Sequence, residues 1–424
     1  MSRFRHFAVD VSPIRDNVAF RWLFIGEAVS VGGTQVTQVA IPLQIYQLTR
    51  SSLDVGLVGL AALVPLLVFG LWGGAIADAF DRRTLIIITA LGSGTVSLVL
   101  MVQALAGLHQ VWLLYACVAV QSAFFAVDSP ARRAMVPQLV GPQQLAAANN
   151  LFFAMFNFGV IIGPLLAGVL AGGFGFGAAY GFDVASFAVA FVAVFFRLPS
   201  LPPAHDARKA GLRSIIEGLG FLRGRHVLLM TFALDIVAMV FGMPRALFPA
   251  LAANHFHGGI GTAGWLYAAP AVGALIASLS GGWMSRVHRQ GVAIIWAILA
   301  WGAAITVFGV SSSLIVGLFF LAVAGASDTI SAVFRSTMLQ AAVPDGMQGR
   351  LSGVFMVVVA GGPRLGDLEA GGAAALAGTG FSVISGGIAC IALTLVLSAL
   401  VPAFARYDAR EQVQGEREPQ PTHA

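Results

Sequence analysis

The chain has 424 residues, of which 58% are hydrophobic and only 10% are charged, and its mean hydropathy is +0.86. Soluble domains carry about 25% charged residues, so this composition excludes an ordinary soluble enzyme or binding domain. The net charge of +5 does not indicate a nucleic-acid partner, because the basic residues lie beside apolar segments rather than in one polar patch.

Apolar segments of helix length follow one another from residue 18 to residue 403. Polar tails at 1–17 and 404–424 flank them, and a polar linker at 198–226 interrupts them. The predicted spans are 18–47, 55–77, 84–106, 111–134, 147–171 and 178–197, then 227–253, 260–285, 291–310, 313–338, 351–377 and 380–403. Since a span needs about 20 apolar residues, the pattern predicts an all-α membrane protein. Its 12 transmembrane helices would form two six-helix halves, 18–197 and 227–403.

Almost all of the 24 basic residues fall in the tails, in the linker and in connections that share one side of the membrane. Arg132 and Arg335, near the ends of predicted spans, are assigned to such connections. Lys and Arg gather in cytoplasmic loops of membrane proteins. We therefore expect a multi-pass protein of the inner (plasma) membrane with both termini and the linker in the cytoplasm.

The two halves also share residues at a constant offset. The pairs Pro42 and Pro249, Gly74 and Gly281, and Arg82 and Arg289 are each separated by 207 residues. A constant offset indicates an internal repeat. Transporters built from two such repeats hold substrate between their halves near the membrane midplane, and we expect the same arrangement here.

No pattern typical of an enzyme or a metal site occurs in the sequence. Cys117 and Cys390 lie inside apolar runs, and His255 and His257 make no metal-binding set. No nucleophile with a base, and no phosphate-binding loop, stands at a recognisable spacing. We therefore expect no enzyme activity, no metal and no cofactor.

The segment Gly73–Arg83, GGAIADAFDRR, lies between the second and third spans. It resembles the loop signature of the major facilitator superfamily, G-x-x-x-D-[RK]-x-G-[RK]-[RK]. Gly74 is the first glycine of the signature, Asp78 the acidic residue, and Arg82 and Arg83 the basic pair.

In that superfamily the acidic and basic residues of the signature latch the cytoplasmic face when the carrier opens outward. The resemblance implies that Asp78 meets the start of the eleventh helix at 351–353, with Arg82 nearby, as a carboxylate suits a helix N-terminus. The alternative is that these charges only anchor the topology, which is the role expected of Arg83. The chain departs from the signature at two positions, and at one of them Asp81 replaces a glycine.

Segments 40–49, 128–148, 235–249 and 343–366 resemble the enterobactin-exporter and macrolide-efflux-like branch of this superfamily. The resemblance covers nearly the whole chain outside the tails. It implies export rather than uptake.

The fifth span contains Gly159, Gly163, Pro164 and Gly168. This set resembles the later part of a motif associated with proton antiporters of the superfamily. Small residues at this spacing let helices pack closely, and proline kinks a helix. Plain helix packing and an antiporter-type bend are both consistent with the set. The Arg of the related fourth-helix motif is replaced by Val118, which argues against proton coupling through that helix.

Ionisable residues inside spans are costly and usually functional. Glu27, Asp235 and Asp328 have no opposite charge within a turn of their own helices, and we expect them to bind protons or cations. The alternative is that they form ion pairs with other helices, for example with Arg245 or Arg364.

Other charges have local explanations. Asp128 precedes Arg132 by four residues, and Arg364 precedes Asp367 by three, so each pair is expected to neutralise itself. Arg364 and Asp367 remain candidates for the substrate or proton site. Asp183, near the outer end of its span, is expected to be solvated.

Gln35 and Gln38 add polar groups to the first span, where they contact either substrate or neighbouring helices. Together these features predict a monomeric secondary transporter in the lipid bilayer. We expect a proton-coupled exporter of amphipathic small molecules, of the drug or siderophore class, that works by alternating access. The competing hypothesis is a non-coupled lipid-flipping or scaffold protein of the same fold.

Overall fold

The computed structural model describes residues 10–199, 217, 220–342 and 345–408. Within its helices, the side chains at 71, 73–75, 77, 78 and 345–357 lie outside this description. The chain divides into two compact units. The first consists of Met1–Gly211 and Ala252–Ala268, and the second of Leu212–Leu251 and Ala269–Ala424.

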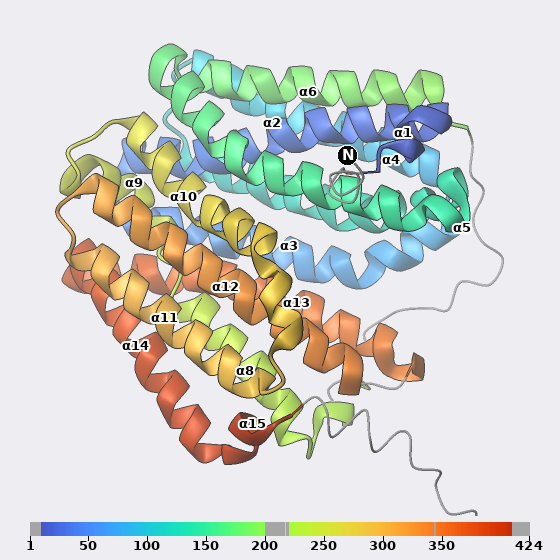
Figure 1. The fold of residues 1–424 in the computed structure, drawn as a ribbon. Helices are drawn as coiled ribbons and strands as arrows, with labels where there is room; N and C mark the ends of the chain where they lie inside the picture. Colours follow the sequence, from blue (N-terminus) through green and yellow to red (C-terminus); the bar gives the residue numbers. More distant parts are fainter. Residues whose placement is uncertain (1–9, 200–216, 218–219, 343–344, 409–424) are drawn as a thin grey trace, which may run out of the picture. The chain divides into compact units, whose positions relative to one another are not determined.

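The described N-terminal part of the first unit is helical. It contains α1 (Ser12–Asp16), α2 (Val18–Thr49), α3 (Ser52–Ala79), α4 (Arg82–Leu105), α5 (Val111–Phe174) and α6 (Phe176–Arg197). α6 runs alongside α2 and contacts α4 as well (Figure 1). Leu23, Ile86, Met135 and Val194 come from four of these helices and pack into one buried cluster. The burial of such apolar side chains holds the helices together.

Polar side chains cap the first turns of three helices. Asn17 begins α2, Ser51 begins α3 and Asp81 begins α4. Each side chain accepts a hydrogen bond of 2.9–3.2 Å from the backbone N–H three residues later. An N-cap of this kind stabilises a helix by about 1 kcal/mol. The cap gives Asp81 a structural role at the position where the loop signature has glycine.

α5 contains two spans that reverse direction at Gly141. Gly141 has φ of 71° and ψ of 171°, a backbone conformation that residues other than glycine rarely adopt. Pro142 follows at the start of the second helical stretch, where proline is well tolerated because the first turn of a helix does not need its backbone N–H. The predicted connection at 135–146 is therefore mostly helical, with a sharp turn at one glycine.

The later helices follow in chain order. They are α8 (His226–Phe241), η2 (Arg245–Leu247), α9 (Phe248–Ala250), η3 (Leu251–His255), α10 (Ile260–Leu279), η4 (Gly281–Arg286), α11 (Gln290–Val310), α12 (Leu314–Ala342), α13 (Asp345–Ala377), α14 (Thr379–Leu400) and α15 (Pro402–Arg406). α11 packs against both α12 and α14 (Figure 1).

The seventh span is broken, so the predicted continuous helix at 227–253 is wrong. α8 ends at Phe241, and short 3-10, α and π segments follow. Gly242 and Pro244 stand at the break. Pro lacks a backbone N–H and Gly disfavours helix interiors, so both weaken the helix at this point.

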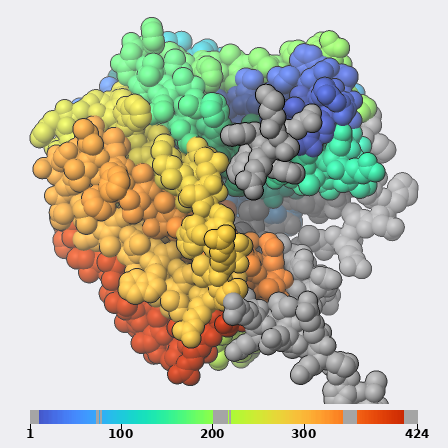
Figure 2. All heavy atoms as spheres, in the orientation of Figure 1, coloured from blue at the N-terminus to red at the C-terminus, as the bar shows by residue number. Residues whose placement is uncertain are grey.

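Nine helices within the described residues are long and apolar enough to cross a membrane, and α5 among them holds two spans. α2 and α13, of 32 and 33 residues, also have sufficient length but carry more polar side chains. The structure thus confirms the predicted all-α membrane protein with 12 spans. Figure 2 shows α12 and α14, in orange and red, at the surface of the second unit. Ile315 on α12 and Leu400 on α14 are 79% and 72% exposed, as expected of lipid-facing helices.

Candidate functional site

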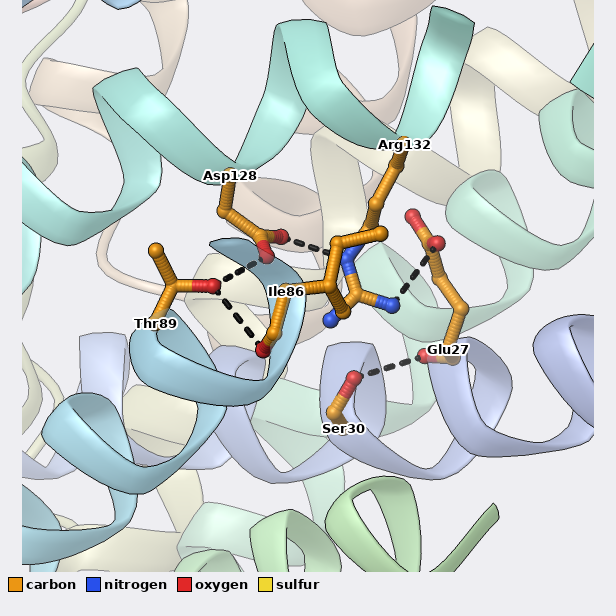
Figure 3. Close-up of polar contacts among 6 residues, drawn as sticks. All are labelled: Glu27, Ser30, Ile86, Thr89, Asp128 and Arg132. Atoms are coloured by element: carbon orange, nitrogen blue, oxygen red, sulfur yellow. Dashed lines mark hydrogen bonds and ion pairs between the residues drawn. The ribbon is translucent and has the colours of Figure 1, made fainter. Parts of the chain in front are cut away.

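Three charged side chains meet inside the first unit (Figure 3). Nη1 of Arg132 on α5 lies 3.3 Å from Oε2 of Glu27 on α2, and its Nε lies 2.5 Å from Oδ2 of Asp128. The Arg132 side chain is 8% exposed, whereas Glu27 and Asp128 retain 22% and 20%. These three residues form the N-terminal triad. The predicted local pair of Asp128 with Arg132 is confirmed, and Glu27 joins it from another helix.

Thr89 on α4 completes the surroundings of the N-terminal triad (Figure 3). Its hydroxyl donates a 2.6 Å hydrogen bond to Oδ1 of Asp128, so both oxygens of that carboxylate have partners. Buried charges are tolerated where they are paired and hydrogen-bonded. The triad thereby connects α2, α4 and α5.

A second triad lies inside the second unit. Nη1 of Arg335 on α12 donates a hydrogen bond to Oδ1 of Asp235 on α8. Nη2 of Arg335 is 3.8 Å from Oδ1 of Asp328 on its own helix. This distance is within reach of an ion pair but too long for a hydrogen bond, and Oδ1 of Asp328 has no hydrogen-bond partner in the described part of the chain. Asp235, Asp328 and Arg335 form the C-terminal triad.

The two triads share one design. In each, the first span of a predicted half supplies one carboxyl group, and the fourth span supplies the arginine and the second carboxyl group. Two carboxylates and one guanidinium leave a net negative charge when all three groups are ionised. Uncompensated charge is costly in a low-dielectric interior.

The structure therefore places Glu27, Asp235 and Asp328 beside arginines, and their partners are Arg132 and Arg335. Both arginines lie inside helices rather than in the cytoplasmic connections to which the sequence assigned them. A role of the three acids in proton binding stays a prediction.

Asp183 on α6 forms a different kind of site, in which hydroxyl groups surround a buried carboxylate. Thr37 on α2 and Ser97 on α4 each donate a 2.7 Å hydrogen bond to Oδ2 of Asp183, and Ser186 lies 3.3 Å from Oδ1. The side chain is fully buried. The expectation that Asp183 is solvated is wrong, because the residue faces the helices beside it rather than the membrane surface.

Arg364 and Asp367 lie on α13, near the break in the seventh span. Nη1 of Arg364 donates a 2.5 Å hydrogen bond to the carbonyl oxygen of Ala360. The Asp367 carboxylate is within electrostatic reach of Arg245 in the break and of Arg364 on its own helix. The self-neutralising pair of Arg364 with Asp367 stays a prediction.

The family model described as Transmembrane secretion effector, one of the major facilitator models, matches residues 8–422. The chain belongs to this major facilitator family. The proteins of this family and the relatives described below are transporters, so this major facilitator chain is a transporter and not an enzyme.

Two relatives of this transporter are named as exporters. The Enterobactin exporter EntS of Citrobacter koseri is 28% identical over 403 residues, which cover 94% of this chain and 95% of the relative. The protein of the same name from Escherichia coli O1:K1 is 27% identical with the same coverage.

Solved structures of other transporters share the fold. The nucleoside transporter NupG superposes with a TM-score of 0.68 at 13% identity, covering 92% of this chain and 100% of that one. A bacterial homologue of the human lysosomal transporter Spinster gives a TM-score of 0.71 at 16% identity, covering 97% and 100%. The predicted major facilitator fold is confirmed.

The structure describes only some residues of the loop signature of this major facilitator protein. Arg82 is 4% exposed, and its Nε and Nη1 have no hydrogen-bond partner among the described residues. Nη2 of Arg83 donates a 2.5 Å hydrogen bond to a backbone carbonyl oxygen on α6. The surroundings of Gly74 and Asp78, and the side chains at 351–353, lie outside the described residues. The latch of the major facilitator family therefore stays a prediction for this chain.

The glycines of the fifth span pack against α2. A Cβ atom on Gly159 would lie 2.9 Å from Val31, and one on Gly163 would collide with Gln35. The backbone and Cβ of Gln35 thus occupy the space beside Gly163, whereas the Gln38 side chain is exposed. The close packing that small residues allow is present between these helices.

The same span also packs against α10. A Cβ atom on Gly168 would lie 3.2 Å from Cα of Gly261, and one on Gly264 would lie 2.7 Å from the carbonyl oxygen of Pro164. Two helix backbones therefore touch with no side chain between them. The antiporter-type bend stays a prediction.

No group of three or more His, Cys, Asp or Glu that could hold a metal ion occurs among the residues that the structure describes.

Proposed function

We propose that this transporter is a proton-coupled exporter of amphipathic small molecules that works by alternating access. It would operate in the inner membrane with both termini in the cytoplasm, as the distribution of basic residues predicts. The proton gradient would supply the energy, and no cofactor would be needed.

The observation that carries the proposal is the charge balance of the two triads. Each has two carboxyl groups for one guanidinium, so each can gain and lose one proton inside the membrane. Proton binding by Glu27 would weaken its attraction to Arg132, which joins α2 to α5. A proton that changes the strength of a contact between helices also changes the equilibrium between their arrangements, and this linkage is the physical basis of coupling.

The direction of transport and the substrate class rest on the relatives. Two proteins named as enterobactin exporters match this chain over nearly its whole length. By analogy, we propose outward transport of a siderophore or of a drug-like molecule with a similar mixture of polar and apolar surface.

The experiment that tests the proposal uses purified protein in proteoliposomes with an acidic lumen. Enterobactin and a lipophilic cationic dye are offered outside in turn, and their accumulation is followed together with the luminal pH. We expect accumulation of a substrate with a simultaneous rise in luminal pH, both abolished by an ionophore that exchanges protons for potassium.

Glu27→Gln and Asp235→Asn each remove one titratable group from a triad. We expect gradient-driven accumulation to fall about tenfold or more in each variant. Exchange of substrate in the absence of a gradient should be retained. Asp10→Asn is the matched control, since Asp10 is exposed and lies before the first span. If transport by the wild-type protein does not depend on the proton gradient, this result would instead support a non-coupled protein of the same fold.

A further inference from the structure

The C-terminal triad contains a carboxylate with unused hydrogen-bonding capacity. Nη1 of Arg335 donates a hydrogen bond to Asp235, whereas Nη2 lies 3.8 Å from Oδ1 of Asp328, too far for a hydrogen bond. This oxygen is buried and accepts no hydrogen bond from the described residues. In the N-terminal triad, by contrast, both oxygens of Asp128 have hydrogen-bond partners. The negative charge of the C-terminal triad is therefore least compensated at Asp328.

Ser331, one turn further along α12, provides a second oxygen without a partner. Its side chain is fully buried, and its Oγ makes no hydrogen bond to the described residues. Buried polar atoms are costly to leave without a partner, so most of them have one. Two such oxygens on consecutive turns of one helix indicate a ligand that completes both.

Asp328, Ser331 and Arg335 share one face of α12. At 3.6 residues per turn, they lie within about 60° of one another around the helix axis. Ile315 and Val333, which are 79% and 42% exposed, lie on the opposite face of the same helix. The shared face, called the polar stripe below, thus points away from the lipid-facing side of α12. The Asp328 side chain is 29% exposed, so the stripe is not sealed by its neighbours.

We propose that the polar stripe binds a primary ammonium group of the transported molecule, and hence that amphiphilic amines are substrates. The inference rests on the proposed transport function and narrows its substrate class. An ammonium group offsets the excess negative charge of the triad, and its three N–H donors can serve Oδ1 of Asp328 and Oγ of Ser331 together. Hydrogen bonds of an ionised donor to a carboxylate are about twice as strong as those between neutral groups.

Other end groups suit the polar stripe less well. A carboxylate or phosphate would add negative charge to a triad that already has an excess, and it has no donor for Asp328. A quaternary ammonium group has the positive charge but no N–H, and an alcohol has a donor but no charge. A primary ammonium group combines both properties.

The site also relates the substrate to the proposed proton coupling. The charged groups around Asp328 are Arg335 on its own helix and Asp235 on α8. A proton on Asp328 would neutralise the same excess charge that an ammonium group offsets. Proton and ammonium group would therefore bind at the triad in turn rather than together, as an exchange of one for the other requires.

The test compares three probes that share a pyrene body and differ in the end group: pyrenebutylamine, pyrenebutyltrimethylammonium and pyrenebutanol. The protein is held at pH 7 in nanodiscs of phosphatidylcholine, which has no net charge, and empty nanodiscs give the background. Binding is followed by energy transfer from the 7 tryptophans to pyrene. We expect the Kd for pyrenebutylamine to be about tenfold lower than the Kd for either other probe, equivalent to about 1.4 kcal/mol.

Variants of Asp328 test the charge. Asp328→Asn should raise the Kd for pyrenebutylamine about tenfold, to a value near that for pyrenebutanol. Asp328→Glu keeps the carboxylate and should retain most of the preference for the amine. Asp10→Asn is the control for loss of one negative charge, since Asp10 is exposed and lies before the first span.

Ser331→Ala tests the hydrogen bond without changing any charge. Because Oγ of Ser331 has no partner among the described residues, its removal should not lower the melting temperature. It should still raise the Kd for pyrenebutylamine about threefold, as loss of one hydrogen bond does, and leave that for pyrenebutyltrimethylammonium unchanged. Thr337→Val is the matched control on α12, since the Thr337 hydroxyl donates to the carbonyl oxygen of Val333 and the residue is exposed.

A triad that only held helices together would give other results. Equal affinities for pyrenebutylamine and pyrenebutanol in the wild-type protein would overturn the proposal. A quaternary probe that binds as tightly as the primary amine would also overturn it, because the two unpartnered oxygens would then have no part in binding. Both comparisons use the wild-type protein, so neither depends on the folding of a variant. Thermal unfolding shows whether each variant is folded.

Transport of the same probes separates this inference from the proposed function. Proteoliposomes that move pyrenebutanol as fast as pyrenebutylamine, with Ser331→Ala unaffected, would overturn the inference and leave the exporter intact. A preference for the amine in binding, without movement of any probe or of enterobactin, would support the site and contradict the transport function. Ser331 does not titrate, so its variant distinguishes loss of substrate binding from loss of proton coupling.

Discussion

The Thr37 hydroxyl on α2 donates a 2.7 Å hydrogen bond to the Asp183 carboxylate on α6. Ser97 on α4 donates to the same oxygen, so one carboxylate connects three helices of the first unit. Gly33 leaves room for this arrangement, because a Cβ atom there would collide with Asp183 and Ser186. Buried polar groups of this kind stabilise a fold only while each has its partner.

Replacement of Asp183 tests this network. Asp183→Ala would leave the buried hydroxyls of Thr37 and Ser97 without their acceptor, so we expect a loss of stability of about 1–3 kcal/mol. Asp183→Asn keeps one carbonyl oxygen as an acceptor and should lose less. Thermal unfolding in detergent, followed by tryptophan fluorescence, measures the difference. An Asp183→Ala variant as stable as the wild-type protein would show that the hydroxyls find other partners.

The N-terminal triad predicts non-additive effects. Arg132→Gln leaves Glu27 and Asp128 without their cation, and removal of one partner from a buried pair costs about 3–5 kcal/mol. The cost should be smaller here because the two carboxylates keep about a fifth of their surface exposed. The double variant Glu27→Gln with Arg132→Gln should be more stable than Arg132→Gln alone. Denaturation of both single variants and the double variant measures the coupling, and strict additivity would argue against the Glu27–Arg132 pair.

The contact between α5 and α10 allows a prediction with an internal control. A Cβ atom on Gly264 would lie 2.7 Å from the carbonyl oxygen of Pro164, and this backbone atom cannot move aside as a side chain can. Gly264→Ala should therefore force the two helices apart and lower both the melting temperature and the transport rate. A Cβ atom on Gly173, on the other helix α5, meets nothing within 4 Å, so Gly173→Ala should be tolerated. Equal behaviour of the two variants would mean that the close contact is not required.

The number and type of the spans could be predicted from the sequence, because a span must be both long and apolar. The pairing of charged side chains between helices could not be predicted from the sequence. Glu27 and Asp235 were singled out because no opposite charge lies within a turn, yet each meets an arginine from a helix about 100 residues away in the sequence. Arg132 and Arg335 were interpreted as loop charges because they stand near the ends of predicted spans, whereas α5 and α12 continue past them.

The direction in which a side chain points was also beyond sequence reasoning. The position of Asp183 along its span indicated a residue near the membrane surface, but its side chain faces the hydroxyls of Thr37 and Ser97. The hydroxyl residues in α2 and α4 are the sequence signal that indicates buried polar partners for this carboxylate. Gly242 and Pro244 were likewise visible as helix breakers, and the strong apolar character of the surrounding segment concealed the break.

The carbonyl oxygen of Gly242, at the break in the seventh span, accepts a hydrogen bond from a side chain that a substitution can remove. Nε1 of Trp301 donates a 2.8 Å hydrogen bond to the carbonyl oxygen of Gly242, and Trp301 is 2% exposed. Trp301→Phe removes this donor and should cost about 1–3 kcal/mol, because the carbonyl oxygen at the break is left without it. Trp296→Phe is the matched control on the same helix, since Trp296 is 67% exposed. Similar losses in both variants would mean that the effect comes from loss of the indole ring in general, and the hydrogen bond would then have no special part in holding the broken helix.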